Sequence, residues 1–421
     1  MDCARNGASP PPLSYRRKLL FLLSAATFFE GYDGFVLGFL VSAILSDFGG
    51  STAQAGLVRA VAVTGSVAAA VLAGRADRMG RRRLLLLTVT GYTLATAVTA
   101  ASVNLVMLAV TQFIAQVFLG AEWAVAMSLL AEEVSTGERG RKLGILASMG
   151  TLGGVTVGLV AFAGLGETPL GWRAFYLVGI APLVLVAVAR RRLLESELFT
   201  VVRGRLPESR LAGMLEPWRS RFRATLIAIG CVHFFRYLAL SAAVFWWPFY
   251  AQREVGLSVS VSGLYLAAGG LMGVGGFWVA GRLMDAWGRS RAFACYMIGA
   301  FVLGVALFQS HSPVAMLPLL CGAIFFGLGS GTMTSAFATE GFPTYIRCRA
   351  ATWARNVFEI PGGVLGPLIV GWLSDNPAGP IRSVGDAVTL LFLITIVPLV
   401  FIAWRFIPET KGRDLAALDA V

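Results

Sequence analysis

The chain carries one short motif twice, as Asp77-Arg78-Met79-Gly80-Arg81-Arg82-Arg83 and as Asp285-Ala286-Trp287-Gly288-Arg289-Ser290-Arg291. The offset between the copies, from position 77 to position 285, is 208 residues. The same offset relates Glu132 to Glu340 and Arg139 to Arg347. Two separate stretches that share one offset indicate a chain built by duplication. Membrane repeats of this kind place a ligand site near the midplane, between the two halves.

The composition excludes a soluble fold. Hydrophobic residues make up 57% of the 421 residues and charged residues only 14%, with a mean hydropathy of +0.73. An average soluble domain carries about 25% charged residues. The apolar residues instead form runs long enough to cross a bilayer, at about 20 residues per helix. The predicted spans are 19–45, 57–74, 84–102, 105–131, 143–164, 174–190, 224–249, 260–281, 292–309, 314–338, 352–373 and 387–407.

These spans and the repeat predict three parts. Residues 1–190 form an N-terminal six-helix bundle, residues 191–223 an Arg-rich cytoplasmic linker, and residues 224–421 a C-terminal six-helix bundle with a short cytoplasmic tail. We expect Arg59, Arg173, Arg253 and Arg382 on the outer side and most other Lys and Arg residues on the inner side. This bias marks the cytoplasm. The net charge of +12 therefore reflects membrane topology and predicts no nucleic-acid partner.

The first predicted span holds two acids, Glu30 and Asp33, whose spacing of three puts them on one helix face. A charge at the bilayer centre costs about 2.5–3.5 kcal/mol on insertion scales and is rarely kept without a role. Close carboxylates out of water favour the uptake of a proton. We expect Asp33, and then Glu30, to couple transport to protons. The alternative is a structural pair balanced by a nearby cation.

The seventh span holds His233 and Arg236, also three apart. The guanidinium of Arg236 stays protonated and needs an anion. This anion is either Asp33 or Glu30 across the cavity, or a substrate carboxylate bound by two parallel hydrogen bonds. The alternatives are a permanent ion pair for Arg236 and a neutral packing role for His233.

Two further spans hold charges. In the eleventh, Arg355 and Glu359 have the spacing of a pair one turn apart. We expect Arg355 to act as a gate near the cytoplasm. Glu122, in the fourth span, is expected to pair with a basic group. Trp246, Trp247 and Tyr250, near the end of the seventh span, are expected to form an interfacial belt.

Several motifs resemble the major facilitator superfamily. Residues 281–289 are similar to its loop signature Gly-x-Leu-x-Asp-x-x-Gly-Arg, and residues 340–347 and 408–413 resemble sugar-porter-like members. Residues 120–123 resemble metabolite:proton symporters, and Glu30-Gly31-Tyr32-Asp33 resembles the Asp-Gly-Phe-Asp of aromatic-acid:proton symporters. The resemblance implies an all-α fold of twelve transmembrane helices in two pseudo-symmetric six-helix bundles. The chain departs from this branch at Gln112, where an arginine is usual, and at Gln116.

Two groups of residues follow from the motifs and the intramembrane charges. The predicted substrate-binding group comprises Arg236, His233, Tyr32, Gln112, Gln116, Trp123, Asn356 and Glu359. The predicted gating group comprises Asp77, Arg78, Gly80, Arg81, Asp285, Gly288, Arg289, Glu132, Arg139, Glu340, Arg347 and Arg355. Charge pairs of the gating group are expected to span the two halves at the cytoplasmic face and to break as the halves rock.

The sequence therefore predicts secondary active transport, best described as proton-coupled uptake of a small organic anion such as an aromatic carboxylate. The alternatives are a drug/proton antiporter, a sugar-type porter or facilitator, and a non-transporting membrane sensor. No nucleophile–base pattern indicates an enzyme, and neither a cofactor nor a metal is expected. The expected partners are the substrate, protons and the lipid bilayer. We expect a monomer in a bacterial inner membrane, with both termini in the cytoplasm.

Overall fold

The computed structural model describes residues 13–73, 81–133, 136–180, 215–376, 379–381, 383–407 and 409–411. Within these ranges the regular elements are helices, and ten of them are long and apolar enough to cross a membrane. A shorter apolar stretch, Ser148–Phe162, lies in α6. Each of the twelve predicted spans is helical where it is described, the sixth over residues 172–180. The predicted all-helical membrane fold is therefore confirmed.

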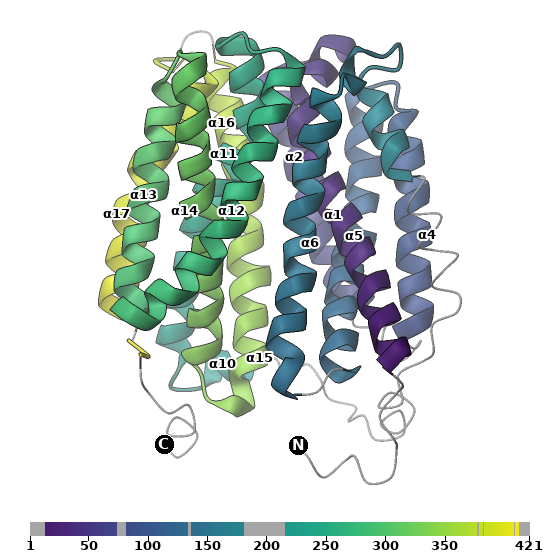
Figure 1. Cartoon of the computed structure of the whole chain (residues 1–421). Helices are drawn as coiled ribbons and strands as arrows, with labels where there is room; N and C mark the ends of the chain where they lie inside the picture. Colours follow the sequence, from purple (N-terminus) through teal and green to yellow (C-terminus); the bar gives the residue numbers. More distant parts are fainter. Residues whose placement is uncertain are drawn as a thin grey trace.

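The helices form two groups that stand side by side (Figure 1). The first group consists of α1 (Leu13–Phe48), α2 (Thr52–Ala73), α4 (Arg81–Ala100), α5 (Leu105–Glu133), α6 (Thr136–Phe162), η2 (Leu165–Glu167) and the helix over residues 172–180. The second consists of α10 (Glu216–Arg219), α11 (Arg223–Phe249), η3 (Tyr250–Glu254), α12 (Val259–Trp287), α13 (Arg289–Gln309), α14 (Pro313–Glu340), α15 (Thr344–Trp353), η4 (Ala354–Glu359), α16 (Ile360–Ser374) and α17 (Val384–Phe406).

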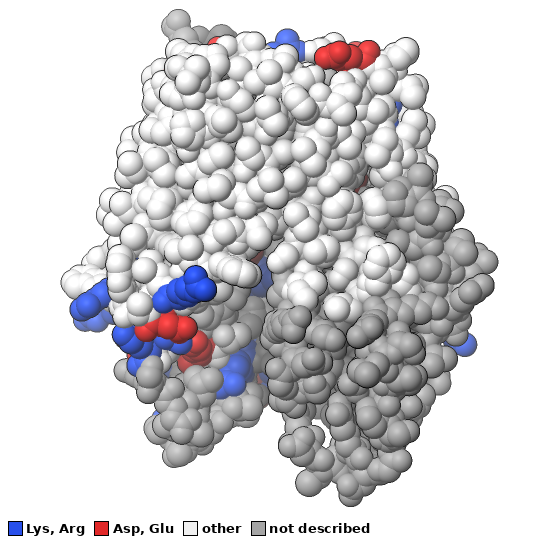
Figure 2. All heavy atoms as spheres, viewed as in Figure 1, with Lys and Arg blue, Asp and Glu red and all other residues white. Residues whose placement is uncertain are grey.

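The molecule has two chemically different ends. We name the end where α12 meets α13 the basic end, and the end where α1 meets α2 the opposite end. In Figure 2 the charged side chains gather at the basic end and at the rim of the opposite end, and the broad middle carries none. Large apolar side chains well inside their helices, such as Leu271, Val302 and Leu393, are exposed. An uncharged girdle of this kind suits contact with lipid.

Glycines allow helices within the first group to approach closely. A Cβ atom on Gly31 of α1 would lie 1.8 Å from the carbonyl oxygen of Gly150 on α6, and one on Gly153 would lie 1.9 Å from that of Phe28. Only residues without a side chain permit such contact between helix backbones. This contact fixes the face of α1 that carries Tyr32 against α6, and leaves Asp33 to point elsewhere.

The described contacts between the two groups lie toward the opposite end. The Thr52 hydroxyl donates to the Gly371 carbonyl at 3.1 Å, which joins α2 to α16. Arg253 donates to the hydroxyl of Ser42 at 2.8 Å and to its carbonyl at 3.0 Å, which joins η3 to α1. The molecule is thus closed at the opposite end.

Two helices of the second group contain a π-helical segment, η3 and η4. A π turn holds one residue more than an α turn, and such turns are frequent at functional sites. η3 follows Trp246 and Trp247, which are buried together with Tyr250. The indole of Trp246 donates to the Pro367 carbonyl at 3.0 Å, and the Tyr250 hydroxyl donates to that of Ser310 at 3.1 Å. The prediction of an interfacial belt here was wrong, because these rings pack between helices.

Candidate functional site

The two acids of α1 point toward different neighbours. Asp33 is only 5% exposed, and the hydroxyl of Tyr92, on α4, hydrogen-bonds to its carboxyl. The charge of Arg59, on α2, acts on Asp33 as well. Glu30 instead faces Glu122 on α5 and Arg355 on η4. The first acid therefore belongs to the interior of the N-terminal group, and the second faces both groups.

Arg59 corrects the sequence analysis, which placed it on the outer side, two residues after the start of the predicted span 57–74. The α2 helix begins at Thr52 rather than at position 57, so Arg59 lies seven residues, or about 10 Å, inside the helix. A capping box explains the early start: the Ser51 amide donates to the Gln54 side chain at 3.0 Å, and the Gln54 amide donates to the Ser51 hydroxyl at 3.3 Å. The pattern Ser-x-x-Gln was the signal in the sequence that could have located this residue.

The surroundings of Arg59 are aromatic and come from both groups. Its guanidinium carbon lies 5.8 Å from the centre of the Phe245 ring on α11, which is a cation–π distance. Tyr176, in the helix over residues 172–180, and Tyr237, on α11, are its electrostatic neighbours together with Asp33. This cluster of one cation, one acid and two phenols is the most polar environment that the structure describes around α2.

Arg236 was expected to face the acids of α1, and its hydrogen bonds lie elsewhere. Its Nε donates to the Ser330 hydroxyl at 2.8 Å and its Nη2 to the Gly327 carbonyl at 3.3 Å, both on α14. The charge that acts on it is that of Glu359. The cation beside Asp33 is therefore Arg59, and Arg236 connects helices within the C-terminal group.

His233 and Glu359 form a buried pair that the sequence analysis did not foresee. The His233 Nδ1 lies 2.7 Å from a Glu359 carboxylate oxygen, and its Nε2 lies 3.3 Å from the Thr334 carbonyl. Glu359 was expected to pair with Arg355 one turn away, and Arg355 does act on it electrostatically. The partner found at hydrogen-bond distance is 126 residues away in sequence, a separation that no local spacing reveals.

The other predicted substrate-binding residues do not form one cluster. The Tyr32 hydroxyl donates to the Phe175 carbonyl at 2.9 Å, and the Gln112 amide donates to the Thr99 hydroxyl at 3.5 Å, within the α4–α5 contact. Gln116 packs against Gly65 of α2. Asn356 is half-buried in η4. The side chain of Trp123 lies outside the part of the chain that the structure describes.

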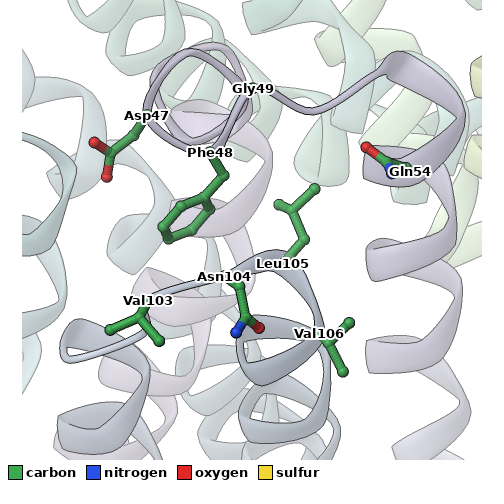
Figure 3. A pocket seen from close by; sticks show the side chains of 8 residues that line it. All are labelled: Asp47, Phe48, Gly49, Gln54, Val103, Asn104, Leu105 and Val106. Carbon is green, nitrogen blue, oxygen red and sulfur yellow. The ribbon is translucent and has the colours of Figure 1, made fainter.

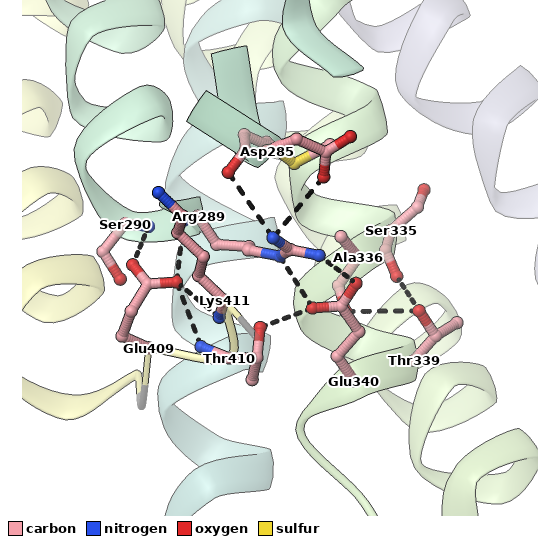
Figure 4. A network of polar contacts seen from close by, with 11 residues as sticks. Asp285, Arg289, Ser290, Ser335, Ala336, Thr339, Glu340, Glu409, Thr410 and Lys411 are labelled. Atoms are coloured by element: carbon pink, nitrogen blue, oxygen red, sulfur yellow. Dashed lines mark hydrogen bonds and ion pairs between the residues drawn. The ribbon is translucent and has the colours of Figure 1, made fainter. Parts of the chain in front are cut away.

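The second copy of the duplicated motif forms a compact polar network (Figure 4). The Arg289 guanidinium donates from Nε to Glu340 at 3.0 Å and lies 3.6 Å from Asp285. Glu409 accepts backbone hydrogen bonds from Arg289 at 2.9 Å and from Ser290 at 3.1 Å. These contacts all join elements of the C-terminal group, so in this copy the described pairs do not span the two halves.

Two features tie the segment around Glu409 to the start of α13. Gly288 has a φ of +92°, and a Cβ atom there would lie 2.7 Å from a Glu409 carboxylate oxygen. Partial burial raises the pKa of Glu409, but four backbone N–H donors, from Arg289, Lys411, Ser290 and Thr410, hold it below its usual value. The glycine of the motif is thus explained by the close approach of a carboxylate.

Other predicted gating residues are described in part or not at all. Arg347 donates from Nε to the Phe342 carbonyl at 3.2 Å, and Arg355 lies beside Glu30. Asp77, Arg78 and Gly80 fall outside the described residues. The helices carrying Arg81, Glu132 and Arg139 are described, but these three side chains are not.

A shallow pocket at the opposite end lies apart from these clusters (Figure 3). Its lining consists of Asp47, Phe48, Gly49, Gln54, Val103, Asn104, Leu105 and Val106. It contains none of the predicted site residues. Over the described ranges, no group of three or more His, Cys, Asp and Glu side chains is placed to hold a metal ion.

Several known proteins are similar to this chain in sequence or in fold. The chain is 26% identical to the niacin transporter NiaP of Acinetobacter baylyi, over 99% of this chain and 100% of that protein. It is 27% identical to a gallate transporter of Pseudomonas putida, over 98% and 95%. The solved D-xylose-proton symporter shares the fold, with a TM-score of 0.76 and 18% identity over 95% of this chain and 99% of that chain.

The family itself is shown by the sequence. The family model of the Major Facilitator Superfamily matches residues 23–362, which is well over half of the chain. This result confirms the resemblance seen in the duplicated motif. The chain belongs to the Major Facilitator Superfamily and is a multi-pass membrane transporter.

Proposed function

We propose that this transporter takes up a small organic anion together with protons, and that aromatic carboxylates are its leading substrate class. The observation that carries the proposal is Asp33, an acid that is 5% exposed within a membrane-spanning helix and lies beside the cation Arg59 and the hydroxyl of Tyr92. Intramembrane acids with such partners are the usual carriers of protons in transporters. Glu30 is the second candidate proton carrier.

The names of the relatives support the substrate class. Niacin and gallate, which the two related transporters carry by name, are both aromatic rings that bear a carboxylate. A drug/proton antiporter would need acids to bind a cation, but here Asp33 already has the Arg59 guanidinium beside it. A sugar-type porter would bind a neutral substrate, and this substrate would need neither the charge of Asp33 nor that of Arg59.

The charges also suggest how the proton and the anion are coupled. While Asp33 is ionised, it balances the charge of Arg59. When Asp33 takes up a proton, Arg59 loses this counter-charge and the region favours an incoming anion. Protonation and anion binding then reinforce each other, which is the requirement for symport.

The orientation follows from the positive-inside rule. We place the basic end, and with it both chain termini, in the cytoplasm of a bacterial inner membrane. Because the described inter-bundle contacts lie at the opposite end, this structure then represents an inward-open state. In this scheme the network of Arg289, Glu340 and Glu409 stiffens the inner end of the C-terminal bundle during rocking. The transporter acts as a monomer with two bundles, residues 1–190 and 224–421, joined by the linker.

Proton-linked uptake can be measured in proteoliposomes that contain a pH dye. Benzoate, nicotinate, a sugar panel and cationic drugs are added to wild type, Asp33→Asn and Asp47→Asn. Asp47 ends the same helix but is exposed and paired with Arg173 at 2.7 Å, so Asp47→Asn is the matched control. We expect carboxylates to acidify the lumen in wild type and Asp47→Asn, and only the slow passive rate in Asp33→Asn. Equal rates in all three proteins would contradict the proposal.

A further inference from the structure

Two buried hydrogen-bond donors near Asp33 have no hydrogen-bond partner among the described residues. They are the Nε of Arg59 and the hydroxyl of Tyr176. Tyr176 is only 1% exposed. A buried donor without an acceptor costs about 1–3 kcal/mol, and more when it is charged. Proteins satisfy nearly all such groups, so two of them in one place call for an explanation.

The two donors belong to one electrostatic cluster with Asp33. Tyr176 lies in the helix over residues 172–180 and Arg59 in α2, and each acts electrostatically on the other and on Asp33. Tyr237 faces Arg59 from α11 of the other bundle. Donors from three helices therefore converge on one region, with the ring of Phe245 5.8 Å from the guanidinium carbon on one side.

The chemistry of this region fits one kind of ligand. A guanidinium and two phenol hydroxyls can all donate hydrogen bonds, and they suit a carboxylate, which accepts up to about four. Aromatic rings with a few convergent polar groups suit a small organic molecule. A neutral sugar would not replace the counter-charge that Arg59 loses when Asp33 takes up a proton.

We propose that Arg59 and Tyr176 form the subsite that binds the carboxylate of the transported anion, with Tyr237 contacting it from the second bundle. This assignment rests on the proposed function and sharpens it, because it identifies the residues that select an acid over its neutral analogue. A ligand held there touches both bundles. Arg59 lies about two helical turns inward from the contact that Thr52 makes with Gly371 at the closed end of the molecule.

The test compares acids with their neutral amides. Binding of benzoate, nicotinate, benzamide and nicotinamide to the purified full-length protein is measured by calorimetry. The variants are Arg59→Gln, Tyr176→Phe and, as a control, Arg173→Gln. Arg173 is an arginine of the opposite end that pairs with Asp47 of the same bundle at 2.7 Å. We expect Arg59→Gln to weaken acid binding about 10- to 100-fold, and Tyr176→Phe about 3- to 10-fold, because charge-assisted hydrogen bonds are the stronger ones. Amide binding and the control should not change.

The outcomes separate this inference from the function on which it rests. If wild type prefers acids and Arg59→Gln keeps that preference, the carboxylate binds elsewhere and the inference is overturned while the proposed function stands. If wild type binds the amides as well as the acids, the proposed function fails and the subsite fails with it. If Arg59→Gln does not fold, Tyr176→Phe decides, because it keeps the ring and its packing. An unchanged acid affinity in that variant overturns the subsite.

Discussion

Each bundle holds some buried polar atoms without a hydrogen-bond partner among the described residues, Ser241 and Trp247 in the C-terminal one, but the charged groups near the middle of the membrane differ between the bundles. In the C-terminal bundle, Arg236 has acceptors on α14, and His233 is held between Glu359 and Thr334. In the N-terminal bundle, the Nε of Arg59 and the hydroxyl of Tyr176 lack a hydrogen-bond partner within the described ranges, and so does one carboxylate oxygen of Glu30.

This difference distinguishes polar groups that stabilise the fold from polar groups that are available to a ligand. A buried polar group that the protein satisfies itself stabilises one arrangement of helices. A buried polar group left unsatisfied lowers stability and is kept where another molecule supplies the partner. The charge content of the two bundles is similar, so the number of intramembrane charges does not reveal which bundle binds the anion. The state of their hydrogen bonds does.

The largest expected effect on stability comes from replacing one intramembrane arginine of each bundle with glutamine. Arg236→Gln removes two hydrogen bonds from a buried cation and should lower the stability of the folded state by about 3 kcal/mol. Arg59→Gln removes a cation whose Nε has no such bond among the described residues, and Asp33 can take up a proton once this counter-charge is lost, so the unfolding temperature should fall less. The stability of both variants is measured by thermal unfolding in detergent, in which the labelling of the free cysteines reports unfolding. The comparison between the bundles breaks down if the two variants lose stability equally.

A smaller effect is expected from the pair of His233 and Glu359. The single variants His233→Phe and Glu359→Gln each leave one buried partner unsatisfied, whereas the double variant leaves neither. A double-mutant cycle on the unfolding temperature should therefore give a favourable coupling of about 1–2 kcal/mol. Additive single effects would mean that the contact of 2.7 Å contributes nothing to the C-terminal bundle.

The smallest effect concerns Glu409 and depends on pH. Because its pKa in the folded protein lies below its ordinary value of 4.5, its contribution to stability is present above that value and is lost as the pH falls through the folded pKa. Wild type should exceed Glu409→Gln in unfolding temperature at pH 7, and the difference should vanish once the pH has fallen below the folded pKa. Glu167→Gln, at the opposite end, serves as the control. A difference that stays constant with pH would contradict the role of the carboxylate charge.

The sequence predicted the fold because its evidence is periodic and repeated. Long apolar runs and one offset of 208 residues between positions 77 and 285 suffice for twelve helices in two halves. Intramembrane acids stand out by rarity, which is why Asp33 and Glu30 could be named. The contact between His233 and Glu359 could not, because their pairing depends on how α11 meets η4 in space.

The predicted position of Arg59 was wrong for a different reason. Hydropathy places a helix boundary wherever polar residues begin, so the predicted span 57–74 began only two residues before Arg59 and left it at the outer end. The capping box of Ser51 and Gln54 is a stronger boundary signal, because it rests on hydrogen bonds rather than on average polarity. Read in that way, the sequence places Arg59 inside the membrane.

The π-helical segment η4 affects the directions in which its side chains point. Its hydrogen bonds run from residue i to residue i+5, so its side chains are spaced around the axis differently from those of an α-helix. Arg355 and Glu359 lie near the two ends of this segment. Arg355 interacts with Glu30 of the N-terminal bundle, whereas Glu359 lies 2.7 Å from His233 of the C-terminal bundle. One short segment thus supplies charged contacts to both halves of a duplicated protein.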